Sequence, residues 1–189
     1  MPRPPRLQAH DGIFHLTTRG NRGASIAVDN HDRACFLELL GAVVRVCGWR
    51  CHAYCLMTNH YHLLVQTPEP TLSAGMQRLN GQYARWFNRR YGLQGHLFER
   101  RYHSVLVEGN AHLLELSRYF ALNPVRAGLC PRPEHWRWSS YPAALGLAAT
   151  PEFLTCDLLL GQFAEQVERA RAQLAAFVDD GLVAVVTAA

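Results

Sequence analysis

The chain of 189 residues contains no lysine, so all 19 of its basic side chains are arginine. It also has no long apolar run, because stretches such as Leu182 to Val186 fall far short of the ~20 residues that a membrane-spanning helix requires. Residues 1–7 are basic but are not followed by the apolar segment of a secretory signal. These absences argue against a membrane protein and predict a cytoplasmic location, with residues 1–7 disordered.

The six cysteines are expected to be thiols, since no export signal accompanies them. Cys47, Cys51 and Cys55 recur every four residues, but a structural zinc site typically uses the shorter Cys-x-x-Cys spacing. Gly48 also interrupts any helical face that these residues would share. Buried thiols are therefore the favoured interpretation.

Charge is distributed unevenly along the chain. Residues 1–141 hold 17 arginines and 9 acidic residues, whereas residues 142–189 hold 2 arginines and 6 acidic residues. Segment 78–101 contains six arginines and a single acid, Glu99, with aromatic residues between them. Guanidinium groups and aromatic faces suit phosphates and unstacked bases. A solvated helix face above an aromatic core stripe would give the same composition.

Apolar spacing predicts alternating strands and helices. Strands are predicted at residues 13–18, 51–57 and 60–66, with a further extended segment at 97–107. Helices are predicted at residues 30–47, 72–91 and from 110 to Pro124, which stops or kinks the third helix. The resulting β-α-β-β-α-β-α order favours an α+β fold with a ferredoxin-like antiparallel sheet and helices packed on it. Apolar residues from Leu159 to Phe177 predict one amphipathic C-terminal helix.

Two histidines stand at i and i+2 on the strand that begins at residue 60. His60 and His62 therefore lie on the same face of the predicted sheet. Two neutral imidazoles can begin a divalent-metal site, which also needs an oxygen donor and an open position for substrate. In a chain with ten histidines, the pair also fits an ordinary surface or core role.

The third helix carries a candidate nucleophile and a candidate oxygen donor. Tyr119 and Asn123 are four residues apart, so they lie one turn apart on one helical face. The phenol of tyrosine is a poor nucleophile while protonated, but a metal that withdraws charge from a phosphate makes its attack feasible. By spacing alone, a core position for Tyr119 and a helix end at Asn123 before Pro124 are the favoured interpretations.

Four blocks in this order closely resemble the HUH single-tyrosine transposases, an IS200-like family, and within it the REP-associated tyrosine transposases. The blocks are Thr17–Arg22, Met57–Val65, Arg118–Leu129 and Trp138–Tyr141. An ordered set of blocks is more specific than any single motif. The resemblance implies a transposase domain of the HUH nuclease fold at residues 8–142, with an acidic helical extension at 143–189.

The resemblance also assigns roles by position. It implies that His60, His62 and Asn123 bind Mg²⁺ or Mn²⁺, and that Tyr119 attacks a phosphate of single-stranded DNA. The attack would leave a 5′-phosphotyrosine and a free 3′-OH, and a later attack by a 3′-OH would reverse it. Because the covalent link conserves the bond energy, no ATP is implied, and the chain has no ATP-binding P-loop pattern.

Family substrates are imperfect palindromes that fold as hairpins and carry a flanking recognition tetranucleotide, which implies both paired and unpaired DNA contacts. The residues expected to contact DNA are Arg19, Asn21, Arg78, Arg85, Arg89, Arg100 and Arg101. For each arginine, the alternative is an ordinary solvated charge.

Two other functions stay open at this stage. One is a domesticated protein of the same fold that binds hairpin DNA or RNA without cleaving it. The other is a metallohydrolase that cuts with an activated water. The acidic extension would cap the domain, mediate dimer contacts or compete with DNA for the basic face. The family includes monomers and dimers, so a homodimer is also open.

Overall fold

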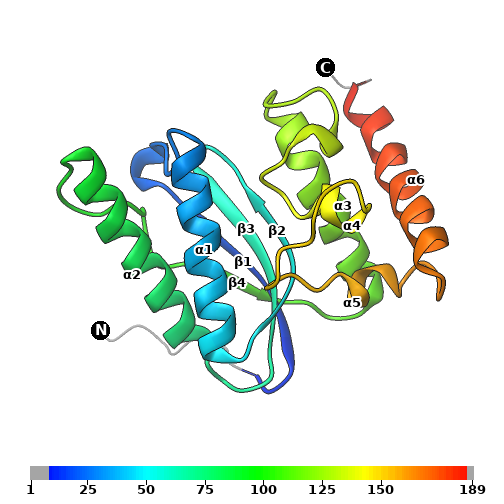
Figure 1. Ribbon diagram of the computed structural model, residues 1–189, viewed down its shortest axis with the longest axis horizontal. Helices are drawn as coiled ribbons and strands as arrows, with labels where there is room; N and C mark the ends of the chain where they lie inside the picture. Colours follow the sequence, from blue (N-terminus) through cyan, green and yellow to red (C-terminus); the bar gives the residue numbers. More distant parts are fainter. Residues whose placement is uncertain (1–8, 187–189) are drawn as a thin grey trace.

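An antiparallel sheet of four strands lies between two layers of helices (Figure 1). The computed structural model describes residues 9–186, so the expected disorder of residues 1–7 lies outside it. The strands are β1 (Gly12–Arg19), β2 (Arg50–Leu56), β3 (His60–Thr67) and β4 (His103–Leu106), in the sheet order β2-β3-β1-β4. This order, with one helix after β1 and one after β3, confirms the predicted ferredoxin-like α+β fold.

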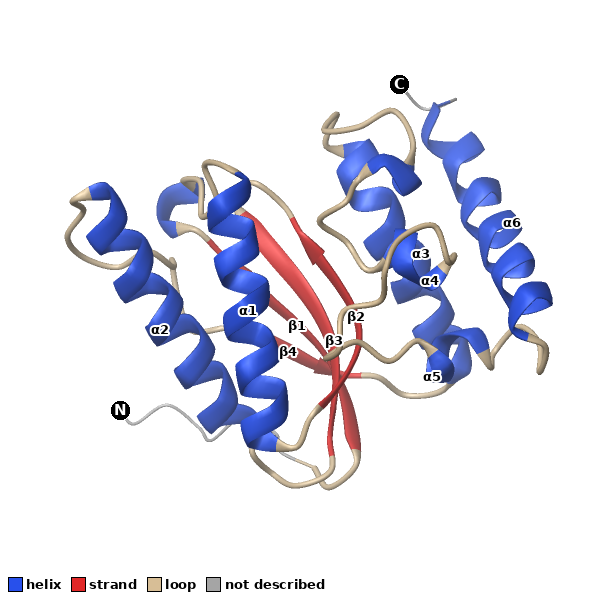
Figure 2. Cartoon of the chain, viewed as in Figure 1, coloured by secondary structure: helices blue, strands red, loops and turns tan. Residues whose placement is uncertain are grey.

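Successive side chains of a strand point to two different apolar layers. Helices α1 (Asn30–Cys47) and α2 (Leu72–Tyr91) cover one face of the sheet, and α3 (Asn110–Arg126) packs on the other (Figure 2). On β1, Phe14 and Leu16 belong to the core under α1 and α2, whereas Ile13 packs with the cluster that contains α3. The period of two thus directs alternate side chains of one strand to opposite layers.

Helix α1 begins at a capping box, in which the Asp29 side chain accepts from the Asp32 backbone N–H and Asp32 returns the bond. It ends at Gly48, whose φ of 64° is left-handed and suits glycine. Gly92 ends α2 in the same way, with a φ of 62°. Both helices have the predicted bounds.

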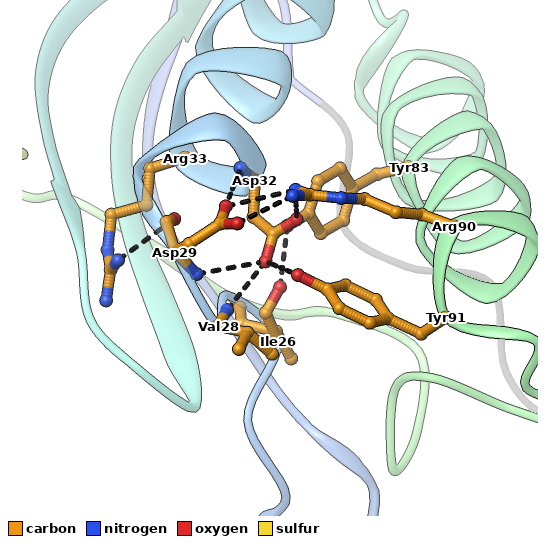
Figure 3. Close-up of polar contacts among 8 residues, drawn as sticks. All are labelled: Ile26, Val28, Asp29, Asp32, Arg33, Tyr83, Arg90 and Tyr91. Carbon is orange, nitrogen blue, oxygen red and sulfur yellow. Dashed lines mark hydrogen bonds and ion pairs between the residues drawn. The ribbon is translucent and has the colours of Figure 1, made fainter.

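A buried carboxylate connects the start of α1 to the end of α2 (Figure 3). The Asp32 side chain has no solvent exposure, and its Oδ2 accepts from the Val28 N–H at 2.7 Å and from the Tyr91 hydroxyl at 2.8 Å. Arg90 forms an ion pair with Asp32 and another with Asp29, the latter at 2.6 Å. These contacts satisfy the buried charge, as its removal from water requires.

The C-terminal segment adds a second apolar core behind α3. Its helices are α4 (Tyr141–Ala144), α5 (Asp157–Leu160) and α6 (Val167–Val186). Ala121 and Leu122 of α3 are buried against Ala170 and Leu174 of α6. Helix α3 therefore lies between the sheet and α6 of the extension. None of the described helices is long and apolar enough to cross a membrane.

Three sequence predictions were wrong in detail. The single C-terminal helix is two helices, because the chain turns at Gly161 after α5 and resumes at Val167. Only residues 103–106 of the extended segment 97–107 form a strand. The third helix does not stop at Pro124 but continues to Arg126, because a proline in the last turn loses only one intrahelical bond.

Asp32→Ala should lower the free energy of unfolding by about 3 kcal/mol, because it leaves the backbone N–H groups of Val28 and Asp29 and the Tyr91 hydroxyl without their buried acceptor. Urea denaturation monitored by circular dichroism measures the change. Glu38→Ala is the matched control, since Glu38 is an exposed acid on the same helix and should change stability by less than about 0.5 kcal/mol. Equal effects of the two substitutions would contradict the role of Asp32.

Candidate active site

The pairing of β1 with β3 places two histidines opposite two polar residues at one end of the sheet. His60 pairs with Arg19, and His62 pairs with Thr17. The two imidazole rings lie 5.0 Å apart between centroids, at right angles. They share the face of the sheet that α3 covers, as the i, i+2 spacing predicts.

His62 is buried and is held from both sides of its ring. Its Nε2 lies 2.9 Å from the Asn123 amide nitrogen on α3. Its Nδ1 lies 3.0 Å from His15 Nε2 and 3.2 Å from the Thr17 hydroxyl, both on β1. When the amide donates to Nε2, that nitrogen carries a lone pair, so the ring proton resides on Nδ1 and points to β1.

His60 has its orientation fixed by the residue before it. The Asn59 amide donates to the Gly23 carbonyl at 3.2 Å, which leaves the Asn59 Oδ1 to accept from His60 Nδ1 at 2.7 Å. The proton of His60 therefore also lies on Nδ1, and its Nε2 has a lone pair.

Both imidazoles are held in the neutral form. Burial, aided by the nearby His60 and His15, lowers the pKa of His62 to about 2. Burial and the charge of Arg19 lower the pKa of His60 below its ordinary value. Neutral imidazole is the form that binds metal ions, so both Nε2 atoms can act as ligands near neutral pH.

Tyr119 stands beside this pair, with its side chain open to solvent. It is 36% exposed, whereas the next residue, Phe120, is 3% exposed and packs into the core beneath. The Tyr119 ring meets the His62 ring edge-on at 5.1 Å between centroids. Asn123 follows one turn later in α3 and also touches His62. Phe120 thus occupies the core position, and Tyr119 remains accessible to a large substrate.

The atoms around His62 can hold a divalent cation. Two imidazole nitrogens and the amide oxygen of Asn123, once its amide group turns over, form a donor set suited to such an ion. Within residues 9–186, no group of three or more His, Cys, Asp and Glu side chains could hold a metal ion. The Asn123 amide, which contacts His62, could supply the oxygen donor.

The predicted DNA contacts divide into two sets. Arg19 pairs with His60 across the sheet, and Asn21 follows at the start of the short helix η1 (Asn21–Gly23). Arg78, Arg85 and Arg89 are exposed on α2, which covers the opposite face of the sheet from Tyr119. Arg100 and Arg101 are exposed on the segment that leads into β4, where Arg100 pairs with Glu99. The structure therefore brings only Arg19 and Asn21 to the histidine end of the sheet.

Three residues of this region have no assigned role from sequence. His15 and Thr17 contact His62 through the β1–β3 register, and Thr17 lies at i+2 from His15. Burial, with smaller effects of His103 and His112, lowers the pKa of His15 to about 4. Arg126 joins Tyr119 in the lining of a pocket of about 290 Å³, seven residues further along α3. The i+7 spacing from Tyr119 is the signal that could have identified Arg126.

Comparison with known structures shows the same fold. The structure of a REP-associated tyrosine transposase bound to a REP hairpin is 17% identical, with a TM-score of 0.65, and the match covers 82% of this chain and 92% of that one. A protein from Deinococcus radiodurans described as a candidate transposase is 18% identical (62% and 95% covered, TM-score 0.45). Yeast (Saccharomyces cerevisiae) tRNA(His) guanylyltransferase is 7% identical (88% and 76% covered, TM-score 0.47).

Comparison of sequences is more specific than comparison of folds. No curated protein matches the chain. The family model described as "Transposase IS200 like" matches residues 8–122, which is more than half of the chain. These residues include β1, β3 and most of α3, and so contain His60, His62 and Tyr119. The chain belongs to the IS200-like transposase family.

Proposed function

We propose that this chain is a divalent-metal-dependent transposase that cleaves and rejoins single-stranded DNA at hairpin-forming repeats through a 5′-phosphotyrosine at Tyr119. The observation that carries the proposal is the exposed Tyr119 ring beside the buried His62, which also contacts Asn123. Membership of the transposase family supports DNA processing. The similar fold of a transposase bound to a REP hairpin supports hairpin DNA as the substrate.

His60 Nε2, His62 Nε2 and the Asn123 amide oxygen would hold the metal ion, which we expect to be Mg²⁺ or Mn²⁺. A bound ion of this kind supplies Lewis-acid polarisation of the scissile phosphate. The chain leaves a lone pair on the Nε2 atom of each histidine. This is because Asn59 is hydrogen-bonded to Nδ1 of His60, and His15 of β1 is hydrogen-bonded to Nδ1 of His62.

The cleavage step exchanges one phosphoester for another. The Tyr119 oxygen bonds to phosphorus as its proton leaves, and the bond from phosphorus to the 3′ oxygen breaks. The departing 3′ oxygen takes up a proton and becomes a free 3′-OH. Attack by a 3′-OH on the phosphotyrosine reverses these changes and restores the phenol. Arg19, which pairs with His60, would contact a phosphate near the cut, and Arg126, which lines a pocket with Tyr119, would contact one beside the phenol.

Tyr119→Phe should abolish the covalent adduct while hairpin binding stays within about twofold of wild type, because only the attacking oxygen is removed. The assay incubates a labelled single-stranded hairpin, taken from the repeats flanking the gene, with Mn²⁺ or EDTA and uses a denaturing protein gel. Tyr141→Phe is the matched control, since Tyr141 is buried in the core behind α3 and should leave adduct formation unchanged.

Other outcomes of this assay separate the alternatives. An adduct that persists in Tyr119→Phe would show that another residue is the nucleophile. Cleavage without any adduct would indicate a metallohydrolase that uses activated water. Tight hairpin binding with no cleavage, under several metals and with flanking sequence present, would indicate a binding protein without strand-transfer activity.

The double substitution His15→Ala/Thr17→Val should weaken Mn²⁺ binding about tenfold, because His62 Nδ1 loses both partners that orient its ring. Titration of the DNA-free protein, followed by the electron paramagnetic resonance of free Mn²⁺, measures the affinity. His15→Gln should retain most of it, since the amide oxygen can accept the same proton. His31→Ala, an exposed histidine on α1, is the control. A wild-type affinity for Mn²⁺ in the double variant would contradict the role of His15 and Thr17 in orienting His62.

A further inference from the structure

The proposed cleavage step releases the proton of the Tyr119 phenol, and the metal donors cannot accept it. A phenol keeps its proton near neutral pH, so attack by its oxygen requires a base within reach. His60 and His62 would use their Nε2 lone pairs for the metal ion, and their Nδ1 atoms carry protons that are donated to Asn59 and β1. The base must therefore be another group beside Tyr119.

His112 lies on the same face of α3 as Tyr119. The two residues are seven apart, which is two turns of the helix. Both line the pocket of about 290 Å³ that also includes Arg126. Long side chains on a helix lean toward its N-terminus, and His112 lies on the N-terminal side of Tyr119. The half-buried imidazole of His112 and the exposed phenol thus share one pocket.

His112 is also near the histidine of β1 that stands beside the phenol. The His15 ring lies 6.3 Å from the Tyr119 ring between centroids and is nearly edge-on to it. Burial is the largest cause of the lowered pKa of His15, and the nearby charges of His103 and then His112 add to it. The imidazoles of His15 and His112 are therefore neighbours, although they belong to different elements.

The other histidines near Tyr119 are less suited to accept the proton. His15 directs its Nε2 to Nδ1 of His62 at 3.0 Å, so this nitrogen is engaged in orienting a metal donor. His103 lies on β4 and is not among the described residues that line the Tyr119 pocket. His112 makes no side-chain hydrogen bond or ion pair with the residues that the structure describes. Its ring nitrogens are therefore open to the phenol or to a bridging water.

Glu115 is the other potential base that lines this pocket. It lies one turn before Tyr119, but its carboxylate pairs with Arg118 at 3.6 Å and its side chain is largely exposed. A carboxylate is also a weaker base than an imidazole. The remaining charged groups of the pocket, Arg118 and Arg126, are permanently cationic. Of the groups that face the pocket, His112 is therefore the one suited to take a proton from a phenol.

We propose that His112 is the general base of strand cleavage, which accepts the phenol proton of Tyr119 directly or through one water molecule. The inference rests on the proposed function, because it takes Tyr119 as the nucleophile. As the Tyr119 oxygen bonds to phosphorus, its proton passes to a ring nitrogen of His112. The bond from phosphorus to the 3′ oxygen breaks, and this oxygen takes a proton from solvent water.

The same residue serves the reverse step. The attacking 3′-OH gives its proton to solvent water, its oxygen bonds to phosphorus, and the bond from phosphorus to the Tyr119 oxygen breaks. The His112 imidazolium then returns its proton to the phenol oxygen. An imidazole suits both directions, because it gains and loses a proton near neutral pH.

His112→Ala should slow single-turnover formation of the covalent adduct about 100-fold, which is a typical contribution of general base catalysis. The assay mixes excess protein with the labelled hairpin and Mn²⁺, and denaturing gels of timed samples give the rate. Hairpin binding in EDTA, measured by fluorescence anisotropy, and Mn²⁺ affinity should stay within about twofold of wild type, since His112 is not a metal donor. His31→Ala, which removes an exposed histidine from α1, is the matched control and should keep the wild-type rate.

Free imidazole separates a proton acceptor from a residue that only packs. Removal of the His112 side chain enlarges the pocket, so added imidazole should enter it and raise the rate of His112→Ala at least about tenfold. Imidazole should leave the wild-type rate unchanged. Glu115→Gln and His103→Ala should each change the rate less than about threefold. His112→Asn, which keeps a polar side chain, should be as slow as His112→Ala and replaces it if circular dichroism shows that the alanine variant is unfolded.

The outcomes separate the role of His112 from the proposed function. A wild-type rate in His112→Ala, or a slow rate that imidazole does not raise, would overturn the role of His112 while the Tyr119 adduct of the wild-type protein stands. A large loss of rate confined to Glu115→Gln or His103→Ala would place the base on that residue instead. Absence of any adduct with the wild-type protein would overturn the proposed function itself.

Discussion

The antiparallel pairing of β1 with β3 is the constraint on which the rest of the candidate site depends. Its register sets Thr17 against His62 and Arg19 against His60. A slip of one residue would turn both histidines into the apolar core beneath α1 and α2, because successive side chains alternate between faces. The same strand then continues into Gly20, which bridges to Phe98, and Asn21, whose N–H donates to the Leu97 carbonyl. One strand thus positions both histidines and the segment that leads into β4.

Helix α3 depends on a second constraint, because it is packed from two sides. Phe120 faces the sheet, whereas Ala121 and Leu122 face α6 and its neighbours. Gly181 allows close approach, since a Cβ there would lie 2.6 Å from the Arg118 side chain. The acidic extension therefore supports the helix that carries Tyr119 and Asn123. One of its acids, Asp179, lies 3.5 Å from Arg132, so part of its charge is compensated within the chain.

Local patterns account for what the sequence could predict. Glycines with left-handed backbone end α1 and α2, and apolar periods of two and of three to four place the strands and helices. The His-x-His and Tyr-x-x-x-Asn spacings are also local, so each predicts a shared face without knowledge of the fold. The apolar residues from Leu159 to Phe177 wrongly predicted one continuous helix. Their helical spacing continues across the turn at Gly161, which divides α5 from α6.

The features that the sequence could not predict depend on the register between strands and on which face of the sheet each helix covers. His15 contacts His62 although 47 residues separate them, and no local spacing reports that pairing. The basic segment 78–101 likewise looks continuous in sequence, but its arginines lie on the face of the sheet opposite Tyr119 or on the segment that leads into β4.

That arrangement limits how a single DNA could use all of these residues. A substrate that reaches both Tyr119 and the α2 arginines must pass around an edge of the sheet, since the strands themselves separate the two layers. The β1–β4 side offers such a route, because β4 is the edge strand, has only four residues and follows the segment that carries Arg100 and Arg101. At the opposite edge, the β2 backbone is joined by residues 138–140, where the Leu56 N–H donates to Trp138 and the Ser140 N–H donates to Tyr54. The covered edge and the open edge thus together favour a path past Arg19 for any DNA that reaches both layers.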